Sequence, residues 1–80
     1  MQQIQVRFFA AARAAAKSDL LWRESGTVAE ILAQYSQENK ELARVLPQCS
    51  FLIDGTVCHD HQTQVLPGSQ LDVLPRFAGG

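Results

Sequence analysis

The sequence predicts an α+β domain in which a sheet carries one helix on one face. Three observations predict this fold class. Residues 4–8 alternate apolar and polar side chains, residues 27–35 combine a helix cap with an apolar stripe, and Asp54-Gly55 separates two short apolar segments. The chain has 80 residues, which suffices for one domain with a single modest core. We therefore expect a domain over residues 1–75 and a flexible C-terminal tail over residues 76–80.

The first third of the chain predicts two strands. Residues 4–8 have the period of two that is typical of a strand with one face in the core. Residues 10–17 are rich in alanine and are expected to form either a loop or a short helix. Residues 19–23 can make a second strand, and Glu24-Ser25-Gly26 breaks that pattern. We expect the second strand to return as a hairpin against the first.

A helix is predicted to begin at Thr27. Thr27 and Glu30 have the spacing of a capping box, in which each side chain accepts a hydrogen bond from the other residue's backbone N–H. The apolar residues that follow fall on one stripe at helical spacing: Val28, Ile31, Leu32 and Tyr35. The polar residues 36–40 end this helix. Apolar residues within 42–46 then predict a second short turn that Pro47 stops.

The last third predicts a hairpin and a final strand. Asp54-Gly55 lies between residues 51–53 and 56–58, and this dipeptide is typical of a type I′ hairpin turn. Residues 66–69 predict a further turn. A last strand is predicted over residues 71–74, and it should end before Pro75, which lacks a backbone donor.

The composition argues against partners that are recognised by charge. Seven basic and eight acidic residues give a net charge of −1, so nucleic-acid and membrane-surface binding are not expected. The longest apolar stretch, residues 8–16, is interrupted by Arg13 and is too short to cross a bilayer. Met1-Gln2-Gln3 lacks the basic region of a secretory signal. We therefore expect a cytoplasmic protein.

The histidines and cysteines are poor candidates for a metal or catalytic site. His59 and His61 flank Asp60, but in an extended segment Cys58 would point to the other side, so we expect a solvated loop and no metal. A two-residue hairpin places Phe51 opposite Cys58 and Cys49 opposite Asp60. The two cysteines would then be diagonal neighbours, beyond disulfide reach, so two separate thiols with a packing role are expected.

The end of the chain carries the candidate reactive group. Gly79 and Gly80 follow a predicted strand closely, and taken alone such a pair is more often an inert tail. Behind Pro75, however, they would form an extended arm without Cβ atoms that can enter a narrow channel and end in an unhindered carboxylate. Leu74 and Phe77 would be apolar anchors on a partner, with packing of Phe77 on its own domain as the alternative.

A carboxylate becomes an acyl donor only after activation, because its own leaving group would be oxide. Joining the carboxylate to AMP supplies a stable leaving group, and this step requires another enzyme. If sulfur then replaces the adenylate, the terminus becomes a nucleophilic thiocarboxylate. In that case the protein is a carrier and not a catalyst.

Three segments of the chain resemble the small, sulfur-carrier subunit of molybdopterin synthase, a member of the MoaD/ThiS group of ubiquitin-like proteins. They are residues 6–13, residues 49–55 and above all residues 71–80, which end in Pro75-Arg76-Phe77-Ala78-Gly79-Gly80. The resemblance covers nearly the whole chain. It implies a ubiquitin-like β-grasp, with a mixed sheet, one main helix on one face and an extended Gly-Gly tail.

The resemblance also implies a sulfur-transfer cycle. An E1-like adenylyltransferase would adenylate Gly80 with ATP and magnesium, and a sulfur donor such as a cysteine desulfurase or rhodanese would supply a persulfide. The large subunit of the synthase would receive the tail in a heterotetramer and pass the sulfur to a pyranopterin, a precursor of the molybdenum cofactor. The carrier itself would bind no cofactor. Its partner-binding residues would be Leu74, Pro75, Arg76, Phe77, Ala78 and Gly79.

Several alternatives share the Gly-Gly ending. Thiamin and cysteine biosynthesis use related carriers, and Arg76 departs from the two consecutive prolines that many molybdopterin carriers have. The length of the chain and the apolar opening of residues 8–10 favour the molybdopterin type. Outside this class, the chain would be a modifier that is conjugated to lysines, or a binding domain with an inert tail.

Overall fold

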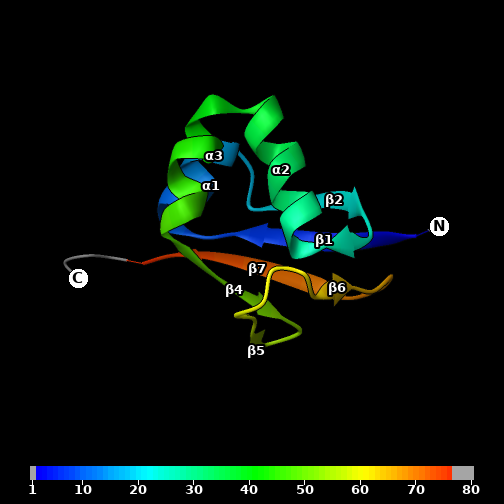
Figure 1. The fold of residues 1–80 in the computed structure, drawn as a ribbon. Helices are drawn as coiled ribbons and strands as arrows, with labels where there is room; N and C mark the ends of the chain where they lie inside the picture. Colours follow the sequence, from blue (N-terminus) through cyan, green and yellow to red (C-terminus); the bar gives the residue numbers. More distant parts are fainter. Residues whose placement is uncertain (1, 77–80) are drawn as a thin grey trace.

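The computed structural model describes residues 2–76 and has two layers, a sheet and a group of helices on one of its faces (Figure 1). The main sheet has five strands in the order β2-β1-β7-β4-β5. Their bounds are β1 Gln3–Phe8, β2 Leu20–Glu24, β4 Cys49–Ile53, β5 Thr56–Val57 and β7 Gln70–Pro75. The helices are α1 Ala10–Ala16, α2 Val28–Glu38, α3 Lys40–Val45 and the 3₁₀ turn η1 Leu46–Gln48.

The sheet is mixed, because its two central strands run parallel and the outer pairs run antiparallel. β1 and β7 are parallel neighbours, with Arg7 beside Asp72. β2 returns antiparallel to β1, with Leu20 beside Arg7, so the predicted first hairpin is confirmed. β4 runs antiparallel to β7. The first and last strands therefore form the middle of the sheet, although they are far apart in sequence.

The alanine-rich segment is a helix and not a loop. α1 begins at Ala10 and ends at Ala16, where Lys17 adopts a left-handed conformation with φ 59° and donates its N–H to the carbonyl oxygen of Arg13. High helix propensity favours this choice. Ala12 is fully buried, so the helix also contributes to the core.

The predicted capping box and apolar stripe of α2 are confirmed. Thr27 Oγ1 accepts from the Glu30 N–H at 3.1 Å, and Glu30 Oε1 accepts from the Thr27 N–H at 2.8 Å. Val28, Ile31 and Tyr35 are buried against the sheet. The second helical turn is also confirmed as α3, although Pro47 lies inside the following 3₁₀ turn and not at its end.

The Asp54-Gly55 hairpin is confirmed, with φ 48° and 85° at the two turn residues. The last strand is longer than predicted, because β7 runs through Pro75. The proline fits because the backbone groups of successive residues in a strand point alternately to its two sides. Arg76 N–H points to the β4 side, where it donates to Gln48 O at 2.9 Å. Val73 O points to the β1 side, where it accepts from Phe9 N–H at 3.2 Å. The nitrogen of Pro75 therefore faces the β1 side, beyond the end of β1, and no ladder donor is lost.

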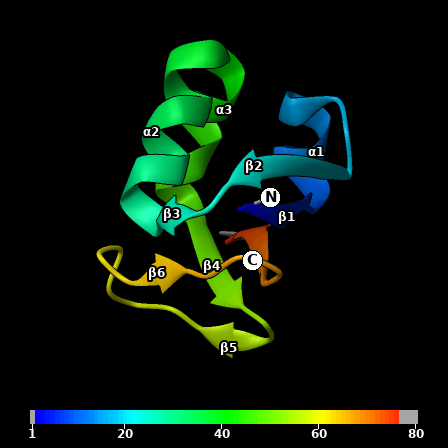
Figure 2. The same ribbon diagram turned by 90° about the vertical axis from the view of Figure 1, so that its right-hand side faces the viewer.

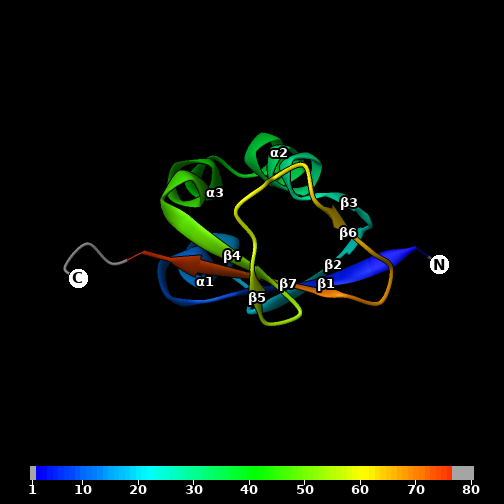
Figure 3. The ribbon, with the colours of Figure 1, turned by 60° about the horizontal axis from the view of Figure 1, so that its bottom comes forward.

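A second, two-stranded sheet was not predicted. It consists of β3 Gly26–Thr27 and β6 Gln64–Val65, which pair at the N-terminal end of α2 (Figure 2). The segment that precedes β6 arches toward α2 (Figure 3), and His61 O accepts from the Ala29 N–H at 2.9 Å. These contacts hold the 58–63 segment against the first turn of α2.

The core lies between the helices and the inner face of the sheet. Its buried apolar residues are Ile4, Val6, Phe8, Ala12, Val28, Ile31, Tyr35, Leu42, Leu46, Cys49, Phe51, Val65, Leu71 and Val73. Every strand of the main sheet except the edge strands β2 and β5 contributes to this set. Over residues 2–76, no helix has the length and apolar character needed to cross a membrane.

Candidate functional site

The structure places three of the predicted site residues at one end of the central strand β7. Leu74 and Pro75 are half-buried there, and Arg76, the next residue, is exposed. The other four predicted residues, Phe77, Ala78, Gly79 and Gly80, lie outside the described residues. The described part of the site is therefore the segment that directly precedes residues 77–80, called the base of the tail below.

This base is held by β4 and η1. Pro75 lies beside Cys49 and Leu74 beside Ser50 in the antiparallel ladder. Arg76 is fixed by the hydrogen bond from its N–H to Gln48 O. Because residue 76 is bonded to a sheet-and-helix scaffold, the point at which the tail begins is set by the fold.

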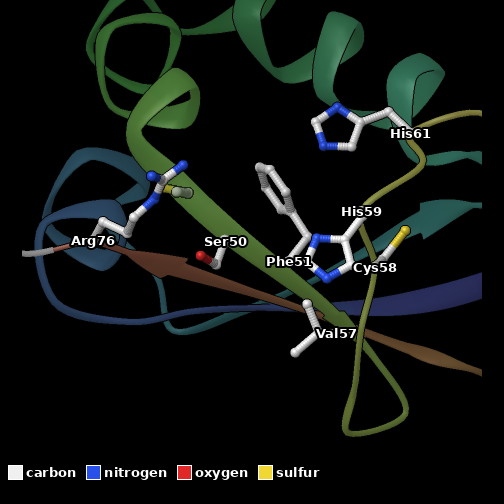
Figure 4. A pocket seen from close by; sticks show the side chains of 8 residues that line it. Ser50, Phe51, Val57, Cys58, His59, His61 and Arg76 are labelled. Carbon is white, nitrogen blue, oxygen red and sulfur yellow. The ribbon is translucent and has the colours of Figure 1, made fainter.

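Two adjoining hollows lie next to Arg76, the first along the edge of β4 and the second on its helix side. The first has a volume of about 440 Å³, and in Figure 4 Arg76 stands at one end of it, His59 at the other and Ser50 between them. The second, of about 460 Å³, reaches toward α2 and η1. Both hollows are lined by Cys49, Phe51, His61 and Arg76.

The histidine segment forms the far wall of the first hollow. The ring of His61 stands edge-on to that of Phe51, with 5.2 Å between the ring centroids. His59, Asp60 and His61 are all exposed, as expected for a solvated loop. Within residues 2–76, no three His, Cys, Asp or Glu side chains are grouped closely enough to hold a metal ion.

The two cysteines are separate thiols, as predicted. Cys49 is buried, and its thiol donates to Val45 O at 3.3 Å. Burial raises the pKa of Cys49 to about 11, so the thiol is protonated at neutral pH.

The predicted pairing of Phe51 with Cys58 is confirmed by a hydrogen bond from Cys58 N–H to Phe51 O at 2.8 Å. The pairing of Cys49 with Asp60 is wrong, because β5 ends at Val57 and the chain turns away to α2.

The face of the main sheet that points away from the helices carries a row of side chains across all five strands. The strand registers align Leu20, Arg7, Asp72, Leu52 and Val57 in that order. Neighbouring residues in a ladder share one face of the sheet, so this row points outward. Sequence reasoning missed it, since the row exists only once the registers are known.

An ion pair lies at the centre of this row. Arg7 donates from Nε to Asp72 Oδ1 at 2.9 Å and from Nη2 to Asp72 Oδ2 at 3.2 Å, and both the hydrogen bond and the charge of Asp72 raise the pKa of Arg7. Asp72 is 6% exposed, whereas the Arg7 side chain is 41% exposed. The Arg7 guanidinium also lies over the ring of Phe9, 5.2 Å from its centroid. The charged centre is therefore held by several contacts and is still reachable through Arg7.

Apolar side chains flank the ion pair on both sides. Trp22 and Val57 are 56% and 53% exposed, and Leu20 is 37% exposed. Leu74, two residues after Asp72 in β7, continues the same face toward the base of the tail. This outward face, formed by Leu20, Trp22, Leu52, Val57 and Leu74 around Arg7 and Asp72, is called the open sheet face below. Its large exposed aromatic and apolar side chains are typical of a surface that another protein covers.

A model of the ThiS family matches residues 6–80 of the chain. No curated protein matches it.

Several solved structures match over nearly their whole length. A putative molybdopterin converting factor, subunit 1, from Pyrococcus furiosus has a TM-score of 0.83 at 14% identity, covering 96% of this chain and 100% of the other. Small archaeal modifier protein 1 from Methanosarcina acetivorans has a TM-score of 0.81 at 22% identity, covering 100% and 98%. A chain from the complex of subunits 1 and 2 of the Helicobacter pylori molybdopterin-converting factor has a TM-score of 0.75 at 23% identity, covering 98% and 99%. These likenesses confirm the ubiquitin-like β-grasp fold.

Proposed function

The chain belongs to the ThiS family, and from this premise we propose that it is a cytoplasmic sulfur carrier whose C-terminal Gly80 is adenylated and then converted to a thiocarboxylate. The observation that carries the proposal is the Gly79-Gly80 ending, placed only a few residues beyond the anchored end of β7. A tail of this kind brings a carboxylate to a partner's active site. The folded domain supplies the surface that the partner recognises.

The chemistry needs three reagents from outside the protein, namely magnesium-bound ATP, a persulfide and a thiol. An E1-like adenylyltransferase joins the Gly80 carboxylate to AMP from magnesium-bound ATP and releases pyrophosphate. The terminal sulfur of a persulfide, held by a donor such as a cysteine desulfurase or rhodanese, then attacks the acyl carbon and AMP leaves. Cleavage of the sulfur–sulfur bond by a thiol leaves the thiocarboxylate on Gly80. The carrier needs no bound cofactor for these steps.

In this proposal, the described residues hold the start of the tail and form the surface on which a partner protein docks. Leu74, Pro75 and Arg76 fix the start of the tail on β4 and η1, so a partner that binds the domain receives the tail at a defined distance. The open sheet face is the docking surface, because it lies beside this base and combines exposed apolar side chains with one arginine. Phe77, Ala78 and Gly79 would lie inside the partner's channel.

We assign the sulfur to the molybdenum cofactor pathway. The large subunit of molybdopterin synthase would be the enzyme that receives the tail and passes its sulfur to the acceptor. Two of the matching structures bear the name of a molybdopterin-converting factor, and in one of them the similar chain is in a complex with its other subunit. Thiamin and cysteine biosynthesis remain the alternatives within this carrier class. In those pathways the same tail would deliver sulfur to an acceptor that a different partner protein binds.

A second candidate function is that of a protein modifier. The specific observation in its favour is the match to small archaeal modifier protein 1, at a TM-score between those of the two converting factors. A modifier would use the same adenylated Gly80 but would transfer its acyl group to a lysine amine. The two functions therefore differ in what attacks the activated carbon.

The first experiment is the intact mass of the protein after incubation with ATP, an E1-like activating enzyme of the molybdopterin pathway and a sulfide source. We expect a mass gain equal to replacement of one oxygen by sulfur, and no gain in a variant that lacks Gly80. Absence of the gain, with an activating enzyme that works on its own carrier, would contradict the sulfur-carrier proposal. Lysine conjugates in cell lysates would support the modifier, whereas a stable complex with the synthase large subunit would support the molybdopterin carrier.

A further inference from the structure

Strand β4 has strand neighbours on both sides along only half of its length. On one side, β7 pairs with all five residues of β4. On the other side, β5 has only two residues and pairs with Leu52 and Ile53. The last bond on that side runs from Cys58 N–H to Phe51 O, after which the chain leaves for α2. Within the described residues, the first half of β4 therefore has an open edge.

The open edge presents a donor and an acceptor. Backbone groups of alternate residues in a strand point to opposite sides. Gln48 O accepts on the β7 side and Phe51 O accepts on the β5 side, so Cys49 O and Phe51 N–H point to the open edge. Within residues 2–76, neither group has a backbone hydrogen-bond partner, either in a turn or in the ladder with β5. One extended segment can satisfy both groups at once.

The two hollows provide room for such a segment. The hollow of about 440 Å³ lies along this edge, between Cys49 and Phe51 on one side and residues 57–61 on the other (Figure 4). In an added strand, every second side chain would point to the helix side of the sheet. There the second hollow, of about 460 Å³, is lined largely by small and apolar side chains: Ala29, Leu32, Ala33, Leu46 and Pro47.

The charge at the edge indicates what kind of segment fits. Arg76 borders both hollows and is exposed. Among residues 2–76 it has no ion-pair partner, in contrast to Arg7, Arg23 and Arg44. A carboxylate on the incoming segment would supply that partner, whereas a lysine or arginine would be repelled.

We infer that the open edge of β4 binds an extended segment of another protein, which adds to the sheet as a short strand, places an apolar side chain in the hollow beside α2 and places a carboxylate at Arg76. Main-chain bonds to Cys49 and Phe51 fix the register, and the hollow selects the side chain. The site adjoins the open sheet face at Val57, which lines the first hollow, and it takes no part in the chemistry at Gly80.

The test is an NMR titration of the full, ¹⁵N-labelled chain with the peptide acetyl-Thr-Val-Thr-Leu-Asp-Glu-amide as the probe. We expect the largest amide shift at Phe51, because its N–H gains an acceptor, with further shifts at Ala33 and Arg76. The control peptide acetyl-Thr-Val-Thr-Leu-Lys-Lys-amide keeps the strand-forming part and reverses the charge. It should bind at least tenfold more weakly.

Two matched variants separate binding at this edge from a general effect. Ala33 and Gln34 are neighbouring, exposed residues of α2, and only Ala33 lines the hollow. Ala33→Trp fills the hollow and should weaken the acidic peptide at least tenfold, whereas Gln34→Trp should leave its affinity within twofold. The dispersion of the amide spectrum shows that both variants are folded. Thiocarboxylate formation at Gly80 is read separately by mass and should be unchanged in both.

Three results would overturn the inference. One is the absence of shifts at Phe51 with millimolar acidic peptide. Another is a set of shifts on the far side of the open sheet face, at Leu20 and Trp22 of β2, in place of the β4 edge. The third is a shift of the Phe51 amide when residues 77–80 are removed without any peptide, since the occupant would then be the chain's own tail.

Discussion

At the scale of single residues, Asp72 is the only charged side chain that is buried among residues 2–76. It lies on the outward side of β7, where Arg7 covers it and satisfies both of its carboxylate oxygens. A buried carboxylate that loses its partner is costly, whereas a half-exposed guanidinium that loses its partner is solvated by water. The two members of the pair should therefore respond differently to substitution.

Arg7→Met should destabilise the protein more than Asp72→Asn. Without its partner, the buried Asp72 carboxylate costs about 2 kcal/mol in the free energy of unfolding. The asparagine of the second variant would keep an acceptor for Arg7, so its cost should be well below that. The double variant Arg7→Met with Asp72→Leu should be at least as stable as either single variant. Urea denaturation of the three variants measures this, and equal losses in both single variants would contradict it.

The thiol of Cys49 should be unreactive in the folded protein. It is buried, it donates to Val45 O, and its pKa is raised to about 11, so almost no thiolate is present at pH 8. We expect iodoacetamide to modify one cysteine, Cys58, and to reach Cys49 only in denaturant. Peptide mass mapping identifies the site, and Cys58→Ser is the control that should leave the folded protein unmodified. Rapid labelling of Cys49 in that variant would refute the prediction.

At the scale of helices and strands, the sequence predicted the features that depend on interactions between neighbouring residues. The capping box at Thr27 and the Asp54-Gly55 turn were found from the sequence because the hydrogen bonds and φ angles that they need involve only neighbouring residues. The strand predicted over residues 4–8 was found from its alternation, and the one predicted over residues 19–23 from the break in pattern that follows it. The fold class followed from the order of these elements.

Features that depend on distant residues were not found. β3 and β6 have two residues each, too few for a periodic pattern, and they exist because the 58–63 segment binds the start of α2. The extension of β7 through Pro75 depends on where β1 ends. The outward row of side chains and the half-open edge of β4 both require the strand registers. The tail motif, in contrast, was visible because its chemistry lies in consecutive residues.

Thr27→Ala tests the start of α2. The variant removes the oxygen that accepts from the Glu30 N–H, and it should lower the free energy of unfolding by about 1 kcal/mol. For a domain of this size, that corresponds to a fall in Tm of about 4 to 8 °C. Gln34→Ala, in the exposed middle of the same helix, is the control and should change Tm little. Calorimetry provides the measurement, and equal effects of the two substitutions would argue against the cap.

The ion pair between Arg23 of β2 and Glu38 of α2 should make stability depend on pH. Hydrogen bonding to Arg23 lowers the pKa of Glu38 from its ordinary value of 4.5. Just below pH 4.5 the unfolded chain therefore binds more protons at this residue than the folded chain. The stability that the pair contributes is present above pH 4.5 and is lost as the pH falls through the lowered, folded-state pKa.

Glu38→Gln checks this sign. Between pH 3 and 6, the Tm of the variant should fall less steeply with decreasing pH than that of the unchanged protein. Thermal melts across this range measure both slopes. Parallel curves for the two proteins would show that Glu38 does not contribute to the acid sensitivity.

At the scale of the whole molecule, the fold separates three surfaces that a carrier can use. The base of the tail lies at one end of β7, the open sheet face lies on the side away from the helices, and the β4 edge lies beneath α2 (Figure 1). Leu74 and Arg76 connect these surfaces, because Leu74 belongs to the open sheet face and Arg76 lines the hollows at the edge. A partner that reaches Leu74 on the open sheet face, or Arg76 at the edge, therefore also contacts the base of the tail.

Substitution of the open sheet face should weaken docking without unfolding the domain. Trp22 and Val57 are more than half exposed, so Trp22→Ser combined with Val57→Ser should change Tm little and weaken binding of the synthase large subunit more than tenfold. Leu66→Ser is the matched control, since Leu66 is 61% exposed but lies outside the five strands of the sheet. Titration calorimetry measures the affinities. Equal weakening by the control would mean that the open sheet face is not the docking surface.

The central position of β7 also governs how the protein folds. Arg7 and Asp72 are neighbours across the sheet although 65 positions separate them in sequence. The β1–β2 hairpin and α2 can form early from local contacts, but the middle of the sheet closes only after a search over most of the chain. Folding dominated by such distant pairing is slow, on the order of milliseconds to seconds, for a small domain. Until β7 docks, β1 and β4 each have an uncovered edge, so this interval is when the nascent protein is most exposed to aggregation and to chaperones.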